Sequence, residues 1–323
     1  MTDTPKTRAF RRYLLSLGWL AGGLLGLVAG LNYFVDPYDY FERNSLGVYV
    51  TNGEREVKQS GLDRYPERAV LLGDSKAGMM DVSQTQESAK IFNAGFGSAT
   101  PEETVAMVKK ISPQAPFVLV GLDYFQFGST APFAPEPFAK RDFWNGINHL
   151  FSGQVLSDSF RTLTGHFRGK QKAFHPDGSF DATDWRAHND VANPAALVRV
   201  FDDRENLARQ FRFSPERIAL LPILRKALDD RNKPYLVYIS PLVEEDWRRM
   251  EKAGLLPEYQ KWSTAVHTVF PDVIDLAHSV YSDPANFFRL DPMHFYPDTG
   301  TAILNRELLP RLNPPSRSLP PIP

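Results

Sequence analysis

A long uncharged apolar stretch near the amino terminus constrains this chain more than any other feature. No charged residue occurs between Arg12 and Asp36, and the 23 positions between them are dominated by leucine, glycine and alanine. As a helix, this stretch would be about 34 Å long, which is enough to cross the hydrocarbon core of a bilayer. The sequence therefore predicts a transmembrane anchor at residues 13–35.

The charges on either side of this stretch predict its orientation. Four basic residues precede it, and three acidic residues follow within seven positions. Positive charge holds its own end in the cytoplasm, so residues 1–12 are expected inside and the remainder outside, on a single-pass inner-membrane protein with a periplasmic main domain. A cleaved signal peptide is the alternative, with Val28-x-Gly30 as the cleavage site. The length of the stretch and the lack of a good A-x-A site favour a retained anchor.

Composition excludes several classes of protein. The formal net charge is -1, which gives no basic field for nucleic acid, and 42% hydrophobic residues indicate a globular chain. Cysteine is absent, which removes disulfides, thiolate nucleophiles and cysteine-ligated zinc, and this absence is compatible with an oxidising compartment. The seven histidines form no H-E-x-x-H pattern. We therefore predict no metal and no cofactor.

Short apolar runs alternate with helical patterns after a polar connector at residues 36–66. Strands are predicted at Ala69–Leu72, at the start of the segment 90–103, at Phe117–Val120, and within the segments 235–241 and 272–277. Thr100 followed by Pro101 predicts a helix start, because threonine is an N-cap and proline suits the first turn. The alternation predicts an α/β fold, a three-layer sandwich around a mainly parallel sheet, over residues 67–313. The proline-rich residues 314–323 are expected to be a disordered tail.

Residues 129–233 interrupt this pattern and are predicted to form a helical insertion. Apolar residues recur there at near-helical spacing, and a structureless loop of such length is improbable inside a domain. Pro222 is expected to kink or break the helix in which it lies. Such an insertion is a natural place for substrate selection, although its basic and aromatic residues are also typical of a solvated face.

Polar residues follow three of the predicted strands. Ser75 follows the first, the loop 93–100 follows the second, and Asp123 follows the third. In open α/β sheets, functional groups gather at the carboxyl ends of strands. Gly, Asp and Ser are also ordinary turn formers and N-caps, so the segment Gly73–Ser75 alone does not define a site.

A fourth element, the segment "DPMHF", places Asp291 three residues before His294. A hydroxyl needs a base within hydrogen-bond reach to become a nucleophile, and histidine has a suitable pKa. A carboxylate on the other ring nitrogen fixes the tautomer and the orientation of the imidazole. Asp291 could reach His294 on one turn, so both become candidates to serve Ser75.

Other conspicuous side chains have plainer interpretations. Arg55 and Lys58 precede the first strand and are expected to face solvent, with orientation of an anionic glycan as the alternative. Trp144, Trp185 and Trp247 could line a sugar site, but aromatic residues in helical segments more often belong to a core.

Taken together, these segments resemble the blocks of the SGNH (GDSL-like) hydrolase superfamily. The four segments are "GDS" (73–75), "NAGFGSAT" (93–100), "GLDY" (121–124) and "DPMH" (291–294). The resemblance implies that Ser75 is an acyl-accepting nucleophile, His294 its base and Asp291 the partner of that histidine. It covers residues 66–127 and 233–310 and leaves the insertion outside.

Two positions depart from the family pattern. The glycine of the second block aligns with Ser98, with Gly97 adjacent, so the register of the oxyanion hole is open. The asparagine of the third block aligns with Asp123, and an ionised carboxylate would repel an oxyanion. Asp123 must then be protonated, turned away or used differently, or it merely caps the following turn.

The wider pattern narrows the resemblance to membrane-anchored proteins associated with O-acylation, such as O-acetylation, of bacterial cell-surface polysaccharides. It implies a serine acyltransferase or acyl esterase, with an acylated or acyl-accepting glycan as substrate and the bilayer as a partner. Such proteins often work beside a multispanning membrane-bound O-acyltransferase. The alternative is a catalytically weak or inactive accessory protein that positions that acyltransferase.

Overall fold

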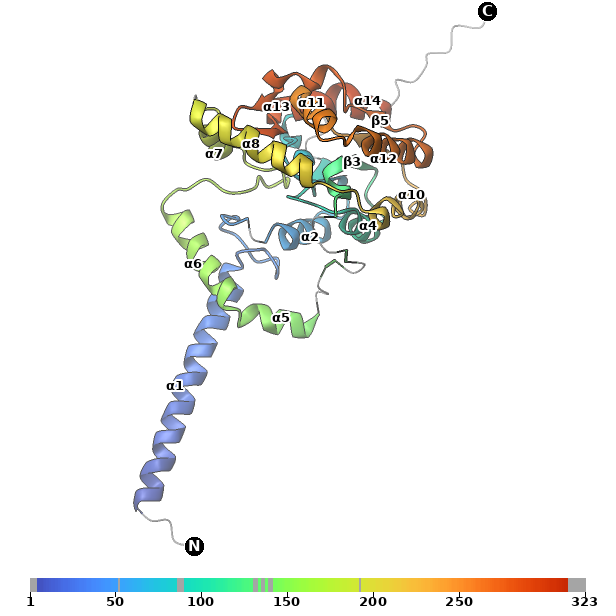
Figure 1. Cartoon of the computed structure of the whole chain (residues 1–323). Helices are drawn as coiled ribbons and strands as arrows, with labels where there is room; N and C mark the ends of the chain where they lie inside the picture. Colours follow the sequence, from blue (N-terminus) through green and yellow to red (C-terminus); the bar gives the residue numbers. More distant parts are fainter. Residues whose placement is uncertain are drawn as a thin grey trace, which may run out of the picture. The chain divides into compact units, whose positions relative to one another are not determined.

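The computed structural model comprises two compact units (Figure 1). Unit 1 is formed by Met1–Gly53 and Ala139–Lys172, and unit 2 by Glu54–Phe138 and Ala173–Pro323. This division runs through both the predicted connector and the predicted insertion. The structure describes residues 5–51, 53–85, 90–129, 133–134, 137–138, 142–191 and 193–312. The predicted disordered tail at 314–323 lies outside the described residues.

Unit 1 is built from three helices. They are α1 (Pro5–Val35), α5 (Phe143–Leu150) and α6 (Gly153–Phe167). Among the described residues, α1 is the one helix that is long and apolar enough to cross a membrane, over Arg8–Val35. Its leucine side chains are exposed along its length. This helix contains the predicted anchor.

The chain turns sharply where α1 ends. Asp36 adopts a positive φ of 45°, and its carboxylate accepts the N–H groups of Tyr40, Phe41 and Arg43 at 2.7, 2.9 and 3.1 Å. Three hydrogen bonds to one carboxylate fix the turn, because each satisfies a backbone donor that no helix or strand uses. The segment leaving α1 is therefore held in one conformation.

The core of unit 2 is a five-stranded, wholly parallel sheet of order β2-β1-β3-β4-β5. The strands are β1 (Ala69–Leu72), β2 (Ile91–Asn93), β3 (Val118–Leu122), β4 (Tyr235–Ile239) and β5 (Ile274–Asp275). All residues of β1, β2 and β3 are buried, as expected when both faces of a parallel sheet are covered. The predicted α/β fold with a mainly parallel sheet is confirmed.

The helices of unit 2 begin and end where the sequence provides signals. Thr100 caps α4 in a capping box with Glu103, as predicted. The predicted break at Pro222 is also found, because α9 ends at Ile218 and α10 begins at Leu221 with the proline in its first turn. The helices are α2 (Glu54–Arg64), α3 (Ser75–Gly78), α4 (Pro101–Lys110), α7 (Thr183–Asn189), α8 (Pro194–Gln210), α9 (Pro215–Ile218), α10 (Leu221–Asp229), α11 (Glu244–Lys252), α12 (Leu256–Val269), α13 (Pro297–Ile303) and α14 (Leu309–Leu312).

Shorter elements complete unit 2. The antiparallel pair β6 (Phe287–Phe288) and β7 (Asp291–Phe295) lies outside the main sheet. Short 3-10 turns connect the larger elements, and a π-helical turn, Leu304–Leu308, joins α13 to α14. The 3-10 turns are η1 (Val82–Gln84), η3 (Tyr124–Phe127), η4 (Val280–Ser282) and η5 (Pro284–Asn286).

Lys58 in α2 does not face solvent, so that prediction was wrong. The side chain is fully buried, and its ammonium donates to the carbonyl of Asn93 at 3.0 Å and to that of Gly178. Burial lowers the pKa of Lys58 to about 7, because a desolvated ammonium is costly. Arg55 is partly exposed and pairs with Glu103 at 2.5 Å.

Candidate active site

Ser75 follows β1 through a turn that only glycine can form. Gly73 has a φ of +150°, and a Cβ there would lie 2.7 Å from the Cβ of Ala77 and 3.0 Å from the carbonyl oxygen of Gly121. Asp74 is the N-cap of α3, since its side chain accepts the N–H of Lys76 at 3.0 Å. The turn-forming interpretation of Gly-Asp-Ser is therefore correct for Gly73 and Asp74. The same turn makes Ser75 the first residue of α3.

His294 and Asp291 both lie on β7. Phe288 pairs with Asp291 while the preceding Phe287 pairs with Phe295, so the register shifts between these pairs. In a regular strand, residues three apart point to opposite faces, and an irregularity of this kind re-aims side chains. The irregular strand allows His294 Nδ1 to lie 2.6 Å from Asp291 Oδ2. The two residues meet on an irregular strand instead of the expected turn.

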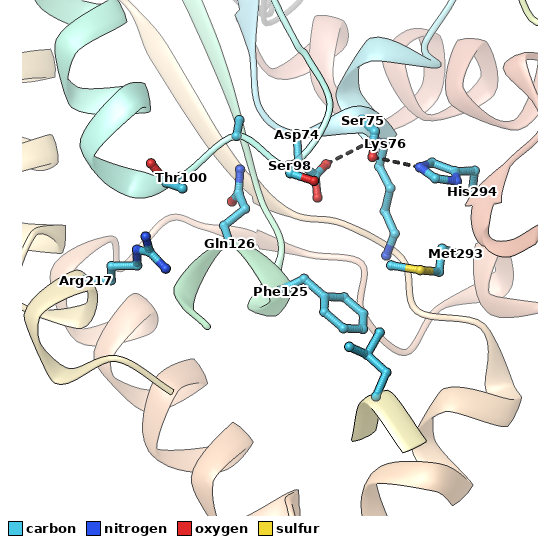
Figure 2. Close-up of a pocket in the computed structure, with 12 residues that line it drawn as sticks. Asp74, Ser75, Lys76, Ser98, Thr100, Phe125, Gln126, Arg217, Met293 and His294 are labelled. Atoms are coloured by element: carbon cyan, nitrogen blue, oxygen red, sulfur yellow. Dashed lines mark hydrogen bonds between the residues drawn. The ribbon is translucent and has the colours of Figure 1, made fainter. Parts of the chain in front are cut away.

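The structure brings the three predicted catalytic residues together. His294 Nε2 lies 2.7 Å from Ser75 Oγ, across 219 positions of sequence (Figure 2). The imidazole therefore bridges a hydroxyl on one nitrogen and a carboxylate on the other. This is the arrangement in which a histidine can take a proton from a hydroxyl while a carboxylate holds its orientation.

Trp185 holds the carboxylate of Asp291 from a second side. Its indole N–H donates to Asp291 Oδ2 at 2.8 Å, and its ring meets His294 edge-on with 5.0 Å between centroids. Burial raises the pKa of Asp291, but the hydrogen bonds from His294 and Trp185 outweigh it and leave this pKa below its usual value. The carboxylate is therefore kept charged. Sequence reasoning placed Trp185 in a core or a sugar site and missed this contact.

The helix that carries Trp185 is fastened to the segment around β7. The N–H of Leu290 donates to the carbonyl of Asn189 at 2.9 Å, and the hydroxyl of Tyr296 donates to Asp190 at 2.6 Å. Asn189 ends α7, and Asp190 follows it. The predicted insertion therefore contributes the element that secures the Asp291–His294 segment.

Asn93 ties the loop after β2 to α3. Its amide donates to the carbonyls of Ala77 and Met80 at 2.8 and 2.9 Å, and its oxygen accepts the N–H of Gly95 at 2.9 Å. The side chain is fully buried. Because α3 carries Ser75, Asn93 fixes the loop relative to the serine.

The structure distinguishes between the two candidates in this loop. Ser98 lines a cavity beside Ser75 and has a φ of 53°, which re-aims the backbone at this point. The N–H of Gly97 donates instead to Glu54 Oε2 at 2.7 Å. Gly97 does not occur among the described residues that line the cavity. Ser98 is therefore brought to the site, and the backbone donor of Gly97 is engaged elsewhere.

Asp123 is turned away from the cavity. Its Oδ2 lies 2.5 Å from the ammonium of Lys76, and its Oδ1 accepts the N–H of Phe125 at 2.9 Å. Both members of this ion pair are buried, and Lys76 also donates to the carbonyl of Pro241 at 2.9 Å. The described lining of the cavity does not include Asp123. Its carboxylate caps the turn η3 and pairs with Lys76 instead of facing an oxyanion.

Gln126 presents a polar group that sequence reasoning missed. Its Oε1 accepts the N–H of Asp123 at 2.9 Å, which leaves the amide nitrogen as the other end of the side chain. That nitrogen is buried and has no hydrogen-bond partner in the part of the chain that the structure describes. Gln126 lines the cavity near Ser98 and Thr100 (Figure 2). An unsatisfied buried donor is costly, so this amide is suited to a ligand oxygen.

The cavity is small. Its volume is about 230 Å³, below the range typical of sites for drug-sized ligands. Leu207 and Arg217 come from the predicted insertion, and Arg217 is neutralised by Glu102 at 2.9 Å. Burial and the nearby charge of Asp123 raise the pKa of Asp74 to about 6. The lining residues are Asp74, Ser75, Lys76, Ser98, Ala99, Thr100, Phe125, Gln126, Leu207, Arg217, Met293 and His294.

No family model matches the chain, and no curated protein matches it. The geometry of the side chains and the motifs that carry them are therefore the basis for a function.

Proposed function

We propose that this chain is an exported, membrane-anchored serine acyltransferase or acyl esterase that acts on O-acyl groups of bacterial envelope polysaccharide. The hydrogen-bonded row of Ser75, His294 and Asp291 carries the proposal, with contacts of 2.7 and 2.6 Å. Its members lie at positions that match the first and last blocks of the SGNH (GDSL-like) superfamily. Nucleophile, base and orienting carboxylate are the three parts that acyl transfer through a serine requires.

The reaction proceeds in two steps. Ser75 Oγ attacks the carbonyl carbon of the acyl donor as its proton passes to His294 Nε2, and the leaving group departs with that proton. A sugar hydroxyl, or water, then attacks the acyl-serine and gives its proton to His294, and Ser75 regains a proton as it is released. Asp291 holds the imidazole through Nδ1 in both steps. Transfer to a sugar hydroxyl makes an acyltransferase, and transfer to water makes an esterase.

The carbonyl oxygen gains negative charge during each attack and needs hydrogen-bond donors. Gln126 offers an unpartnered amide nitrogen in the cavity, and Ser98 lies on the same lining. We assign this role to Gln126 and to the Ser98 loop, in place of the asparagine that the family pattern places at Asp123. Loss of one such donor typically costs about 2.7–4 kcal/mol of transition-state stabilisation.

The fold supports the same proposal at a coarser level. The five-stranded parallel sheet carries Ser75 after β1 and the Ser98 loop after β2, at the carboxyl ends of neighbouring strands. An SGNH-like three-layer sandwich requires its serine and its second block to lie at such neighbouring strand ends. With α1 as a single-pass anchor in the inner membrane, unit 2 belongs in the periplasm, where envelope glycans are found. A small cavity favours a short acyl group.

A non-catalytic accessory role, in which the chain positions a multispanning O-acyltransferase, is the alternative. An aspartate facing the oxyanion was the sequence feature that favoured it. Asp123 instead pairs with Lys76, so this feature no longer argues against catalysis. A membrane O-acyltransferase can still be a partner of the active enzyme, as the source of the acyl group.

Labelling with a fluorophosphonate probe tests the proposal. The full chain in detergent should be labelled at Ser75, and Ser75→Ala and His294→Ala should each reduce labelling by at least about 10³-fold. Ser83→Ala is the matched control, because Ser83 is an exposed serine that bonds to Asp81 outside the cavity. A folded wild-type chain whose Ser75 does not react would overturn the catalytic proposal and leave the accessory role.

A further inference from the structure

Helix α5 leaves its two aromatic side chains exposed. An ordinary surface helix buries its apolar side and exposes its polar side. In α5, His149 stacks on Tyr40 with 4.4 Å between ring centroids. Phe143 and Trp144 are 73% and 71% exposed, and no residue of the helix is buried. The helix therefore packs on the protein through His149 and its half-buried aliphatic residues, and it turns its two aromatic side chains outward.

This helix is fastened to the end of α1. Asn32, in the last turn of α1, donates to the carbonyl of Leu150 at 2.8 Å and to that of Ser152 at 3.3 Å. Its oxygen accepts the hydroxyl of Ser159 at 3.1 Å, which adds α6 to the same junction. Asn32 is fully buried, so the junction is part of the interior of unit 1. Phe34, two residues further on, is exposed. The ring of Phe41 contacts Tyr33 of α1 and His149 of α5, with 5.2 and 5.6 Å between ring centroids, so aromatic side chains link the end of the apolar span to α5.

We propose that α5 lies in the interfacial layer of the bilayer, on the side where α1 emerges, with Phe143 and Trp144 inserted at the level of the lipid headgroups. Aromatic rings are enriched at this depth, because one part of each ring system is apolar and the indole also carries a donor. The segment 143–150 contains no Asp, Glu, Lys or Arg, so no charged group has to be desolvated. This proposal rests on α1 spanning the membrane and does not depend on acyl transfer.

Lipid is favoured over a protein partner because α5 is attached to the end of the apolar helix α1. If α1 spans the membrane, its exposed apolar side chains lie in lipid. Asn32 holds the carboxyl end of α5 against α1, so the exposed aromatic side chains of α5 belong to the same unit as the span. Helix α6 begins at this junction and leads away from α1, ending at Phe167, which is 81% exposed (Figure 1). Phe167 therefore offers a matched control in the same unit, equally exposed but at the far end of α6.

Spin labelling tests the proposal directly, because the chain has no cysteine and single cysteines can be introduced. Full-length Phe143→Cys, Leu20→Cys and Phe167→Cys are spin-labelled and placed in nanodiscs of phosphatidylcholine and phosphatidylglycerol. Collision rates with oxygen, which concentrates in lipid, and with a water-soluble nickel chelate are then measured. The label at position 143 should favour oxygen, as at position 20, while the label at position 167 should favour nickel.

Two outcomes would overturn the proposal. Nickel accessibility at position 143 equal to that at position 167 would place α5 in water. Protection from both reagents would indicate a protein partner, and spin broadening that disappears on dilution with unlabelled chain would identify that partner as a second copy. Trp144→Cys provides a second labelling position if the first variant folds poorly. Fluorophosphonate labelling of Ser75 in the same variants reports separately on the proposed catalytic function.

Discussion

The two units of this chain use apolar side chains in opposite ways. In unit 2, large side chains such as Trp262 and Phe211 are buried, and every member of the main hydrophobic core lies in this unit. In unit 1, Trp19 and Trp144 are largely exposed. Unit 2 therefore buries its large apolar side chains within itself, whereas unit 1 leaves apolar surface exposed, as the proposed membrane anchor requires. All residues described around the cavity belong to unit 2, so the proposed anchoring and the proposed catalysis are assigned to different parts of the sequence.

The largest expected effect concerns the ion pair inside unit 2. Asp123→Asn retains a cap for Phe125 but leaves the buried ammonium of Lys76 without its carboxylate. Breaking a buried pair in this way costs about 3–5 kcal/mol, so the free energy of unfolding should fall by this amount in urea titrations. Asp230→Asn, which removes an exposed pair with Lys226, should cost less than about 0.5 kcal/mol.

The same variant tests whether the stability of unit 2 is independent of the surroundings of unit 1. The loss caused by Asp123→Asn should be the same in detergent and in nanodiscs, because both partners lie in unit 2. If the fall in the free energy of unfolding depended on lipid, the stability of unit 2 would depend on the surroundings of unit 1.

A smaller effect should appear as a dependence of stability on pH. The pKa of Lys58 is about 7 in the fold and 10.5 without burial, so between these values the unfolded chain binds more protons than the folded one. Stability must then rise with pH through this window. The wild-type chain should gain about 2 kcal/mol relative to Lys58→Met between pH 7.5 and 9.5, since each pH unit contributes at most about 1.4 kcal/mol. Parallel stability curves for the two proteins would show that Lys58 is charged in the fold.

The smallest effect is kinetic and sharpens the assignment of the site to unit 2. Trp185→Phe keeps an aromatic ring beside His294 but removes the N–H that holds Asp291, a hydrogen bond to a charged group. The rate of fluorophosphonate labelling should fall about 10-fold, which corresponds to about 1.4 kcal/mol, while the urea midpoint stays close to that of wild type. Trp247→Phe is the control, because its N–H bonds to the carbonyl of Ala277 instead. An equal fall in both variants would assign the effect to general loosening.

Local signals in the sequence were sufficient for much of unit 2. Strand β1 occupies the predicted positions, because a run of four apolar residues ends at a glycine turn. Helix α4 begins where Thr100 and Pro101 predict it. Asp291 and His294 are close in sequence, and the motif at Ser75 predicted the other partner of the histidine. In each case a short segment contains the information that fixes its own structure.

Contacts between distant segments could not be predicted in the same way. Trp185 reaches Asp291 across 106 positions, and Lys76 reaches Asp123 across 47. Nothing in the local pattern indicates that Lys76 will be buried, because its burial depends on a carboxylate supplied by the residue that follows β3. The apolar spacing around Phe143 likewise predicts a helix correctly but does not tell whether its apolar face meets protein or lipid.

The distance along the chain between Ser75 and His294 also sets an order of events during biogenesis. In the proposed topology, in which the amino terminus stays in the cytoplasm and α1 is retained in the membrane, the segment that carries Ser75 is exported before the segment that carries His294. Until β7 docks beside α3, the hydroxyl has no base and remains as unreactive as any other serine. If Ser75 is the nucleophile we propose, its reactivity is acquired in the last stage of folding, and a nascent or carboxyl-terminally trimmed chain would carry the serine without its base.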